Sequence, residues 1–172
     1  MPGGSDEQQK WFEGELTSAS PRKALIVTVH HPPYSLDTTH RGYPDIELAI
    51  DRAIQNTKRT PTIILSGHVH SYQRYERNLN QKNVPYVIAG AGGYANRPQL
   101  LHKIEKSAGG KPLEDGLQTK IPGLALMKYN DSNPGFLRVS LDGKRKTLTC
   151  DYFLVPFNGA HGKSPFDTVT VP

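Results

Sequence analysis

The sequence has 172 residues, the size of one ordinary domain, and 35% of them are hydrophobic while 22% are charged. This composition is typical of a folded globular domain and excludes a low-complexity chain. The single cysteine, Cys150, excludes an internal disulfide and a cysteine-based zinc site.

The formal net charge of +5 suits an anionic partner such as a phosphate group. The basic residues are scattered, however, and they match no recognised nucleic-acid-binding motif, so we expect no nucleic-acid partner. No run of apolar residues is long enough to cross a bilayer, so we expect no membrane partner either.

The first part of the chain predicts an α/β unit. A helix is predicted over 6–16, and the nearly continuous apolar run 23–29 predicts a strand that is covered on both faces. A second helix is predicted over 44–54, and a short buried strand over 61–65 follows it. The order strand, loop, helix, strand is typical of α/β folds.

The pattern changes in the second half of the chain. A strand is predicted over 85–89, and the polar residues 95–122 predict a long loop. Four successive strands with turn signals between them are then predicted over 124–129, 135–141, 146–154 and 167–171. We therefore predict an α/β fold with a mixed sheet and a C-terminal antiparallel meander, in a single domain over 1–172.

Histidines follow both strands of the predicted α/β unit. His30 and His31 come directly after the strand 23–29, and His68 and His70 come directly after the next strand. In open α/β sheets, ligand sites gather at the carboxyl ends of strands. Because alternate residues of an extended chain point the same way, we expect His68 and His70 to face one small volume.

Two histidines one residue apart are, by themselves, more often surface side chains than a metal site. The second histidine pair, in a matching position, favours the metal site, because imidazole suits zinc, iron, copper and nickel. A further interpretation is an α/β domain whose histidines merely fill loops, but it leaves three motif histidines at two strand ends unexplained.

The two motifs are V-H-H-P-P-Y-S over 29–35 and S-G-H-V-H-S-Y over 66–72. Together they resemble the calcineurin-like metallophosphoesterases, and within these the purple-acid-phosphatase-like branch. The resemblance implies an α/β/β/α sandwich, of which this chain matches the C-terminal half. It also implies a phosphate ester substrate, which a dinuclear centre of Fe, Zn or Mn hydrolyses. Relatives in this branch are often exported, so the resemblance favours a secreted or periplasmic protein, although the sequence leaves the compartment open.

The resemblance assigns His30 and His68 to one metal and His70 to the other. Two such ions, roughly 3.5–4 Å apart, clamp a phosphoester and generate a hydroxide nucleophile at neutral pH. We expect this chain alone to bind one of the two ions firmly, or neither.

The resemblance gives further residues lesser roles. His40 matches histidines that contact the substrate or protonate the leaving group. His31, Tyr34, Arg41 and Arg74 are predicted to lie around the metals or the substrate, with Tyr34 acting through packing or a hydrogen bond.

Two arginines and two histidines have simpler interpretations. Arg74 and Arg77 could bind phosphate, but ordinary salt bridges explain them more simply. His102 and His161 lie in polar stretches without a partner pattern, so no role is predicted for either.

The family's other ligands come from Asp-x-His, Gly-Asp-x-x-Tyr and Gly-Asn-His elements, and none of these occurs in the 172 residues. We therefore expect the chain to be inactive alone. We also expect it to cover an exposed part of its sheet, either by pairing with the missing N-terminal half or by self-association. The alternative is a non-catalytic binding or interaction module derived from the same fold.

Overall fold

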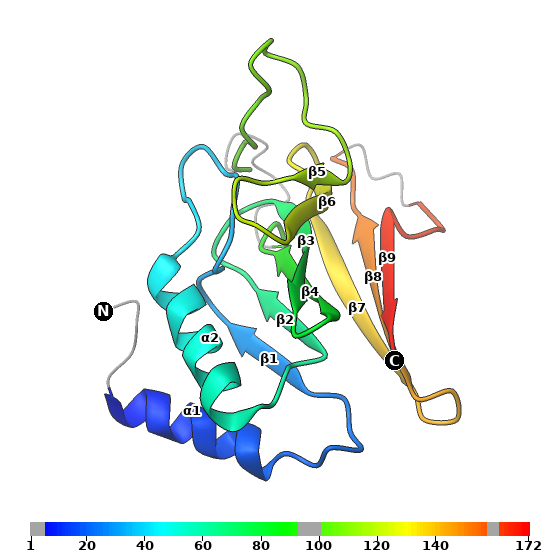
Figure 1. The fold of residues 1–172 in the computed structure, drawn as a ribbon. Coiled ribbons are helices and arrows are strands. Elements are labelled where there is room, and N and C mark those ends of the chain that lie inside the picture. Colours follow the sequence, from blue (N-terminus) through cyan, green and yellow to red (C-terminus); the bar gives the residue numbers. More distant parts are fainter. Residues whose placement is uncertain (1–5, 93–100, 158–161) are drawn as a thin grey trace.

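The computed structural model describes residues 6–92, 101–157 and 162–172 of the chain (Figure 1). Its helices and strands are, in chain order, α1 (Asp6–Ser18), β1 (Ile26–Val29), α2 (Pro44–Thr57), β2 (Ile63–Ser66), β3 (Tyr72–Leu79), β4 (Lys82–Ala89), β5 (Leu117–Gln118), β6 (Leu124–Asn130), β7 (Gly135–Asp142), β8 (Thr147–Leu154) and β9 (Asp167–Val171). The strands form two sheets, and both helices lie on the same side of the larger one.

The larger sheet is mixed, and its six strands have the order β1-β2-β4-β3-β6-β5. β1, β2 and β4 run parallel, whereas β3 is antiparallel to both of its neighbours, β4 and β6. Parallel neighbours need a crossover connection, and α2 supplies it between β1 and β2. The α/β unit and the mixed sheet predicted from the sequence are thus confirmed.

The helical layer is held by one apolar face of α2. Ile50, Ala53 and Ile54 are buried there, and burial of each isoleucine stabilises the fold by about 1.5–3 kcal/mol. α2 ends at Lys58, whose φ of 57° is left-handed. α1 packs beside α2 and buries Leu16 (Figure 1). Within the described ranges, neither helix combines the length and the hydrophobicity needed to cross a membrane.

The smaller sheet is antiparallel, with the strand order β7-β8-β9, and it confirms the predicted meander. Its buried residues share an apolar cluster with the larger sheet, in which the rings of Tyr72 and Tyr152 stack at 3.9 Å. Cys150 belongs to this cluster and is 2% exposed, so it serves as a small buried apolar residue. The resulting layers, helices on sheet on sheet, agree with the predicted sandwich.

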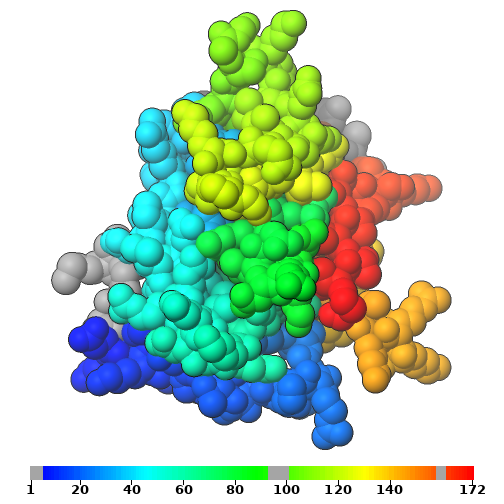
Figure 2. Space-filling model, in the orientation of Figure 1, coloured from blue at the N-terminus to red at the C-terminus, as the bar shows by residue number. Residues whose placement is uncertain are grey.

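Two segments project from this layered body in the space-filling view: the turn between β7 and β8, in orange, and the loop before β5, in lime green (Figure 2). The turn exposes Lys144, Arg145 and Lys146. Part of the positive charge of the chain is therefore carried by a hairpin turn rather than by the ends of the parallel strands.

The structure differs from the sequence prediction mainly over residues 72–81. β3, where no strand is predicted, forms a hairpin with β4 through Asn80 and Gln81, whose φ angles of 52° and 65° are left-handed. Two-residue hairpin turns of this kind usually contain glycine, so this turn sequence gives little signal. The loop predicted over 95–122 lies partly outside the described residues, and part of the remainder forms β5.

An ion pair between the two sheets joins β3 to β9. Arg74 donates to Asp167 from Nε at 2.7 Å and from Nη2 at 3.1 Å, and the Tyr72 hydroxyl donates to the same carboxylate at 2.8 Å. The side chains of Arg74 and Asp167 are 11% and 8% exposed. Burial by itself raises the pKa of Asp167, but the hydrogen bonds from Arg74 and Tyr72 and the guanidinium charge outweigh burial and lower this pKa below its ordinary 3.8.

Replacing Asp167 by asparagine should lower the free energy of unfolding by at most about 3–5 kcal/mol near neutral pH, because it removes the buried carboxylate that Arg74 contacts and leaves the guanidinium only the partly exposed Glu76, 3.2 Å away. Since the pKa of Asp167 is lowered on folding, its contribution is present above the ordinary pKa and is lost as the pH falls through the lowered pKa. Urea unfolding of both chains over a pH series should therefore show the difference shrinking below about pH 4.

Asp142→Asn is the matched control, because Asp142 pairs with Arg145 at the protein surface, where the two side chains are 43% and 83% exposed. This substitution should change the free energy of unfolding by no more than about 1 kcal/mol. Equal small losses for the two substitutions would contradict the role assigned to the inter-sheet pair.

Candidate metal centre

The carboxyl ends of β1 and β2 lie next to each other in the larger sheet. The two strands pair in parallel, with their last residues, Val29 and Ser66, opposite each other. The Gly67 N–H donates to the His30 carbonyl at 3.2 Å, which extends the pairing one step beyond the strands. The loops after β1 and β2 therefore leave the sheet at the same point.

The loop after β2 turns sharply at its histidines. The Val69 N–H donates to the Gly67 carbonyl at 2.6 Å, and His68 has a φ of 61°, a left-handed conformation that is uncommon for residues other than glycine. Gly90 lies against this loop, where a Cβ would stand 2.0 Å from the carbonyl oxygen of Val69. The prediction that His68 and His70 share an extended backbone is therefore wrong, although both rings still lie next to the rings of His40 and His102.

His30, His31 and His68 form one group, here called the His30 cluster, in which one ring nitrogen of each lies within 4.8 Å of the others. His30 Nε2 and His68 Nδ1 are 3.1 Å apart, and the Tyr43 hydroxyl lies 3.0 Å from His68 Nε2. His30 is exposed and the other two histidines are partly buried, so the cluster is open to solvent. The structure thus brings His31 beside two predicted ligands, and Tyr43 is a neighbour that sequence reasoning missed.

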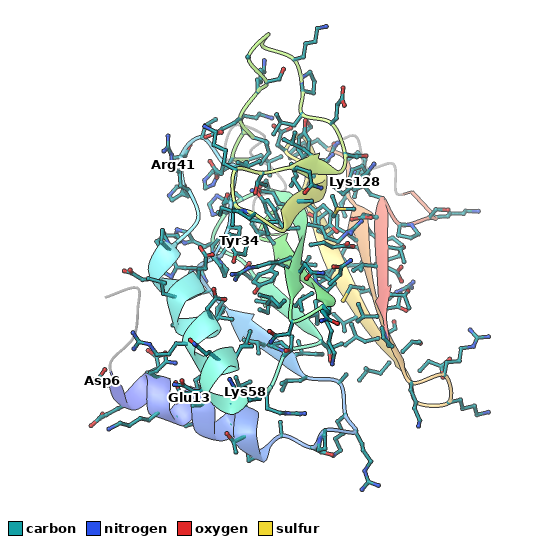
Figure 3. The ribbon with its side chains drawn as sticks, in the orientation of Figure 1. Asp6, Glu13, Tyr34, Arg41, Lys58 and Lys128 are labelled. Carbon is teal, nitrogen blue, oxygen red and sulfur yellow. The ribbon has the colours of Figure 1, made fainter. Side chains whose placement is uncertain are left out.

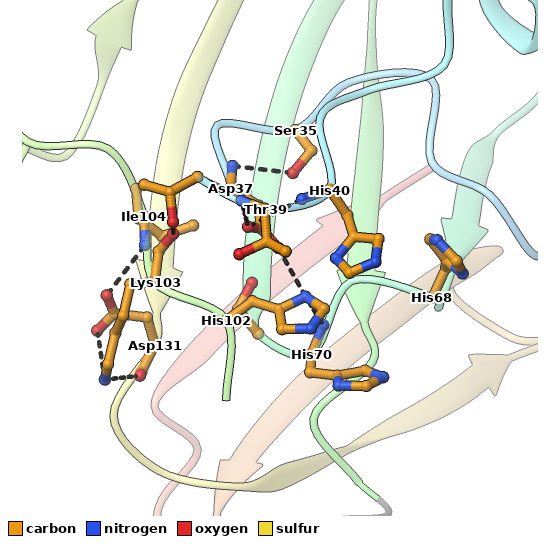
Figure 4. Close-up of polar contacts among 12 residues, drawn as sticks. Ser35, Asp37, Thr39, His40, His68, His70, His102, Lys103, Ile104 and Asp131 are labelled. Carbon is orange, nitrogen blue, oxygen red and sulfur yellow. Dashed lines mark hydrogen bonds and ion pairs between the residues drawn. The ribbon is translucent and has the colours of Figure 1, made fainter. Parts of the chain in front are cut away.

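Asp37, His40 and His102 form a second group, here called the Asp37 cluster, whose ligand atoms also lie within 4.8 Å of one another (Figure 4). Asp37 is 0% exposed, and its Oδ2 lies 2.7 Å from His102 Nδ1. The ring of His102 stacks on His40 at 4.4 Å and on His70 at 4.2 Å. His70 is therefore beside the Asp37 cluster, and the two clusters adjoin where the rings of His40 and His68 meet at 5.1 Å.

Three of these histidines have a lowered pKa, which favours the neutral ring. For His68 and His31 the cause is burial, followed by the charge of neighbouring histidines such as His30. Burial also lowers the pKa of His102, and the opposing effect of Asp37 does not reverse the shift. Neutral imidazole is the form that binds a metal ion, so a lowered pKa favours the metal-binding form of these rings near neutral pH.

Asp37 and His102 are the residues for which sequence analysis predicts no role. They meet because the loop after β1 pairs with residues 102–105, for example through the Thr38 N–H, which donates to the Lys103 carbonyl at 2.9 Å. This contact joins segments far apart in the sequence, and no local sequence pattern predicts it. His161, for which no role is predicted, lies outside the described residues.

The other predicted residues lie farther from the histidine rings or are held by other partners. Tyr34 is buried, and its hydroxyl donates to Glu47 at 3.0 Å. Arg41 is exposed and projects away from the ribbon (Figure 3). Arg74 is held in the inter-sheet pair and Arg77 in a bidentate pair with a carboxylate of α2, so both arginines form the salt bridges that are the simpler interpretation.

Known proteins similar to this chain in sequence include purple acid phosphatases. No protein-family model matches the chain. Purple acid phosphatase 22 of Arabidopsis thaliana is 26% identical over 147 residues, which cover 81% of this chain and 30% of that protein. Purple acid phosphatase 1 of Ipomoea batatas is 37% identical over 86 residues, which cover 49% of this chain and 17% of that protein.

Two solved structures are similar to this chain in fold. The purple acid phosphatase PPD1 from yellow lupin (Lupinus luteus) seeds superposes on 97% of this chain with a TM-score of 0.65 at 18% identity, and the match covers 28% of that protein. GAP50, the anchor in the inner membrane complex of Plasmodium, superposes on 96% of the chain with a TM-score of 0.57 at 14% identity.

The matched region spans 30% or less of the length of the curated purple acid phosphatases named here. In this chain the motif histidines follow the ends of two neighbouring parallel strands. The chain is therefore similar to the purple acid phosphatases in sequence, and its fold is that of part of a purple acid phosphatase.

Proposed function

We propose that this chain is the histidine-bearing part of a metal-dependent phosphoesterase, an acid-phosphatase-like hydrolase with a dinuclear metal centre. The observation that carries the proposal is the meeting of His30 and His68, whose ring nitrogens lie 3.1 Å apart at the ends of β1 and β2. The family resemblance predicts both residues as ligands of one metal. The similarity to purple acid phosphatases supports a phosphate ester as the substrate.

The residues present fit a metal ion. His30 and His68 would hold one ion, with His31 close enough to join them, and His70 would contribute to the other. Neutral rings suit this role, and the lowered pKa of His68 and His31 favours them. When bound, the ions would act as Lewis acids toward the phosphoester.

His40 is the residue of this chain that we propose to contact the substrate. It belongs to the Asp37 cluster, on the loop after β1, and its ring lies 5.1 Å from the ring of His68 in the His30 cluster, centroid to centroid. Arg41 follows it and is exposed, so its guanidinium is free to reach an approaching anion without giving up a buried ion pair.

The remaining ligands of a dinuclear centre have no counterpart among the motifs of these 172 residues, so we propose that another polypeptide segment supplies them. In the described part of the chain, β1 is an edge strand of the larger sheet. Beside it lies a groove of about 450 Å³, lined by apolar residues such as Phe12, Leu25 and Ile46, with Trp11 at 63% exposure. We propose that the segment carrying those ligands covers this groove.

The alternative is a non-catalytic interaction module of the same fold. It is favoured by the fold similarity to GAP50, which is described as an anchor in a membrane complex, at a TM-score of 0.57. In that case the groove beside β1 would bind a partner, and the histidines would serve at most as a weak metal site. Export from the cell stays a prediction from the resemblance.

The chain alone, with added Zn²⁺, Fe³⁺ or Mn²⁺, should hydrolyse p-nitrophenyl phosphate no faster than the metal ions in buffer do. Adding a polypeptide that carries the Gly-Asp-x-x-Tyr and Gly-Asn-His elements of a relative should restore turnover. His30→Ala or His68→Ala should then reduce turnover at least about 100-fold, because each removes a predicted ligand.

Arg145→Ala, at an exposed position in the turn between β7 and β8, is the control and should leave the restored turnover unchanged. Turnover by the chain alone at about 1 s⁻¹ or faster would refute its inactivity. A complex that forms but hydrolyses nothing would favour the interaction module instead.

Trp11 is the single tryptophan of the sequence, so its fluorescence reports on the groove beside β1. Without the covering segment, the chain should self-associate at high concentration, because exposed apolar surface and a free strand edge favour association. Light scattering should show oligomers for the chain and a monomer for Trp11→Glu, and the covering segment should shift the Trp11 emission to shorter wavelength. A monomer at every concentration would count against an exposed docking surface.

A further inference from the structure

A buried carboxylate in the Asp37 cluster lacks a proton donor on one side. Asp37 is 0% exposed, and in the described part of the chain its ion-pair partner is His102. Its Oδ1 accepts hydrogen bonds from the backbone N–H groups of Thr39 and His40. Its Oδ2 receives no hydrogen bond, although His102 Nδ1 lies 2.7 Å away.

The reason is that His102 Nδ1 is already an acceptor. The backbone N–H of His70 donates to it at 3.1 Å, and a neutral ring nitrogen that accepts a hydrogen bond carries no proton to donate. Asp37 Oδ2 and His102 Nδ1 therefore present lone pairs to each other. His40 Nδ1 is a further buried atom without a hydrogen-bond partner in the same cluster. A buried carboxylate oxygen that receives no hydrogen bond is costly, so this arrangement of lone pairs favours a cation.

We propose that Asp37, His40 and His102 form a binding site for a divalent transition-metal ion of the zinc class. One carboxylate and two neutral imidazoles supply three protein ligands and leave a position open, as in zinc sites that also bind water or a small ligand. The ligand atoms of all three residues already lie within 4.8 Å of one another, with the rings of His40 and His102 stacked nearly parallel, at 10°. Both histidines are partly exposed, which leaves the ion a path to the buried oxygen.

The backbone holds these ligands in place without a metal. The Glu105 N–H donates to the Leu36 carbonyl at 2.8 Å, and the His102 N–H donates to the His70 carbonyl at 3.0 Å. Asp37 itself forms an isolated antiparallel bridge with Ile104. The loops after β1 and β2 are thus both tied to the segment that carries His102, so the site is largely organised before an ion binds.

The proposed site is independent of the phosphoesterase proposal. It uses ligands of this chain only, and none of His30, His68 and His70, which the family resemblance assigns to the dinuclear centre. His40 would then be a ligand of this ion rather than the substrate contact proposed above. The site can therefore exist whether or not the chain takes part in phosphate ester hydrolysis.

Titration calorimetry with Zn²⁺ tests the site in the full 172-residue chain carrying His30→Gln and His31→Gln, which disable the His30 cluster. This background chain should bind one equivalent of Zn²⁺, and Co²⁺ should give the absorption of a histidine-bound ion. Adding Asp37→Asn or His102→Gln should weaken Zn²⁺ binding at least about 100-fold. Adding Asp131→Asn should leave Zn²⁺ binding unchanged. Asp131 accepts a hydrogen bond from the Ile104 N–H, on the segment that carries His102, but it is not a ligand of the proposed site.

Thermal unfolding gives a second readout that does not depend on measuring affinity. With EDTA present, Asp37→Asn should be at least as stable as the background chain, because it replaces the buried carboxylate by an uncharged amide whose Oδ1 keeps both turn hydrogen bonds. Added Zn²⁺ should raise the Tm of the background chain but not that of Asp37→Asn. If Asp37→Asn lowers the Tm in EDTA, and Zn²⁺ leaves the Tm of the background chain unchanged, then Asp37 and His102 form an ordinary ion pair and the proposal is overturned. Zn²⁺ binding that survives both Asp37→Asn and His102→Gln would overturn it equally.

Discussion

Parallel pairing of β1 with β2 is the constraint on which the candidate site depends. The register places Val29 opposite Ser66, so the chain leaves both strands at the same height and the two histidine motifs meet. A shift of one residue would send the side chains of a whole strand to the other face of the sheet. Apolar contacts on both sides of the larger sheet hold this register, with helices on one face and the smaller sheet on the other. The meeting of the two histidine motifs therefore depends on ordinary packing.

A buried polar network stabilises the loops above the sheet. Gln73 of β3 is 0% exposed, and its side-chain oxygen accepts hydrogen bonds from the Leu36 N–H and the Tyr75 hydroxyl. Its amide nitrogen donates to the hydroxyls of Ser35 and Ser71, one on each motif loop. One glutamine thus ties together the loop after β1 and the loop after β2. Such fully satisfied networks make a single arrangement much more stable than its alternatives, which a site built on loops requires.

The two histidine clusters differ in whether this chain supplies all of their proposed metal ligands. The His30 cluster stands open to solvent, and by resemblance it needs ligands from elsewhere to complete a dinuclear centre. The Asp37 cluster has its carboxylate within this chain, buried behind the rings of His40 and His102. The stacked rings of His70 and His102 connect the two clusters. The cation site proposed above therefore needs only residues of this chain, whereas the proposed dinuclear centre needs ligands from outside these 172 residues.

The sequence by itself determined the α/β unit, the meander and the meeting of His30 with His68, because these follow from hydrophobic periodicity and from the place of each motif at a strand end. Only the tertiary structure decided the rest. The left-handed backbone at His68 breaks the extended alternation expected there, and no periodic pattern encodes a single φ angle. The β3–β4 hairpin lacks the glycine that usually signals its turn. The Asp37 cluster joins residues 65 positions apart, and such contacts depend on packing across the whole chain rather than on any local pattern.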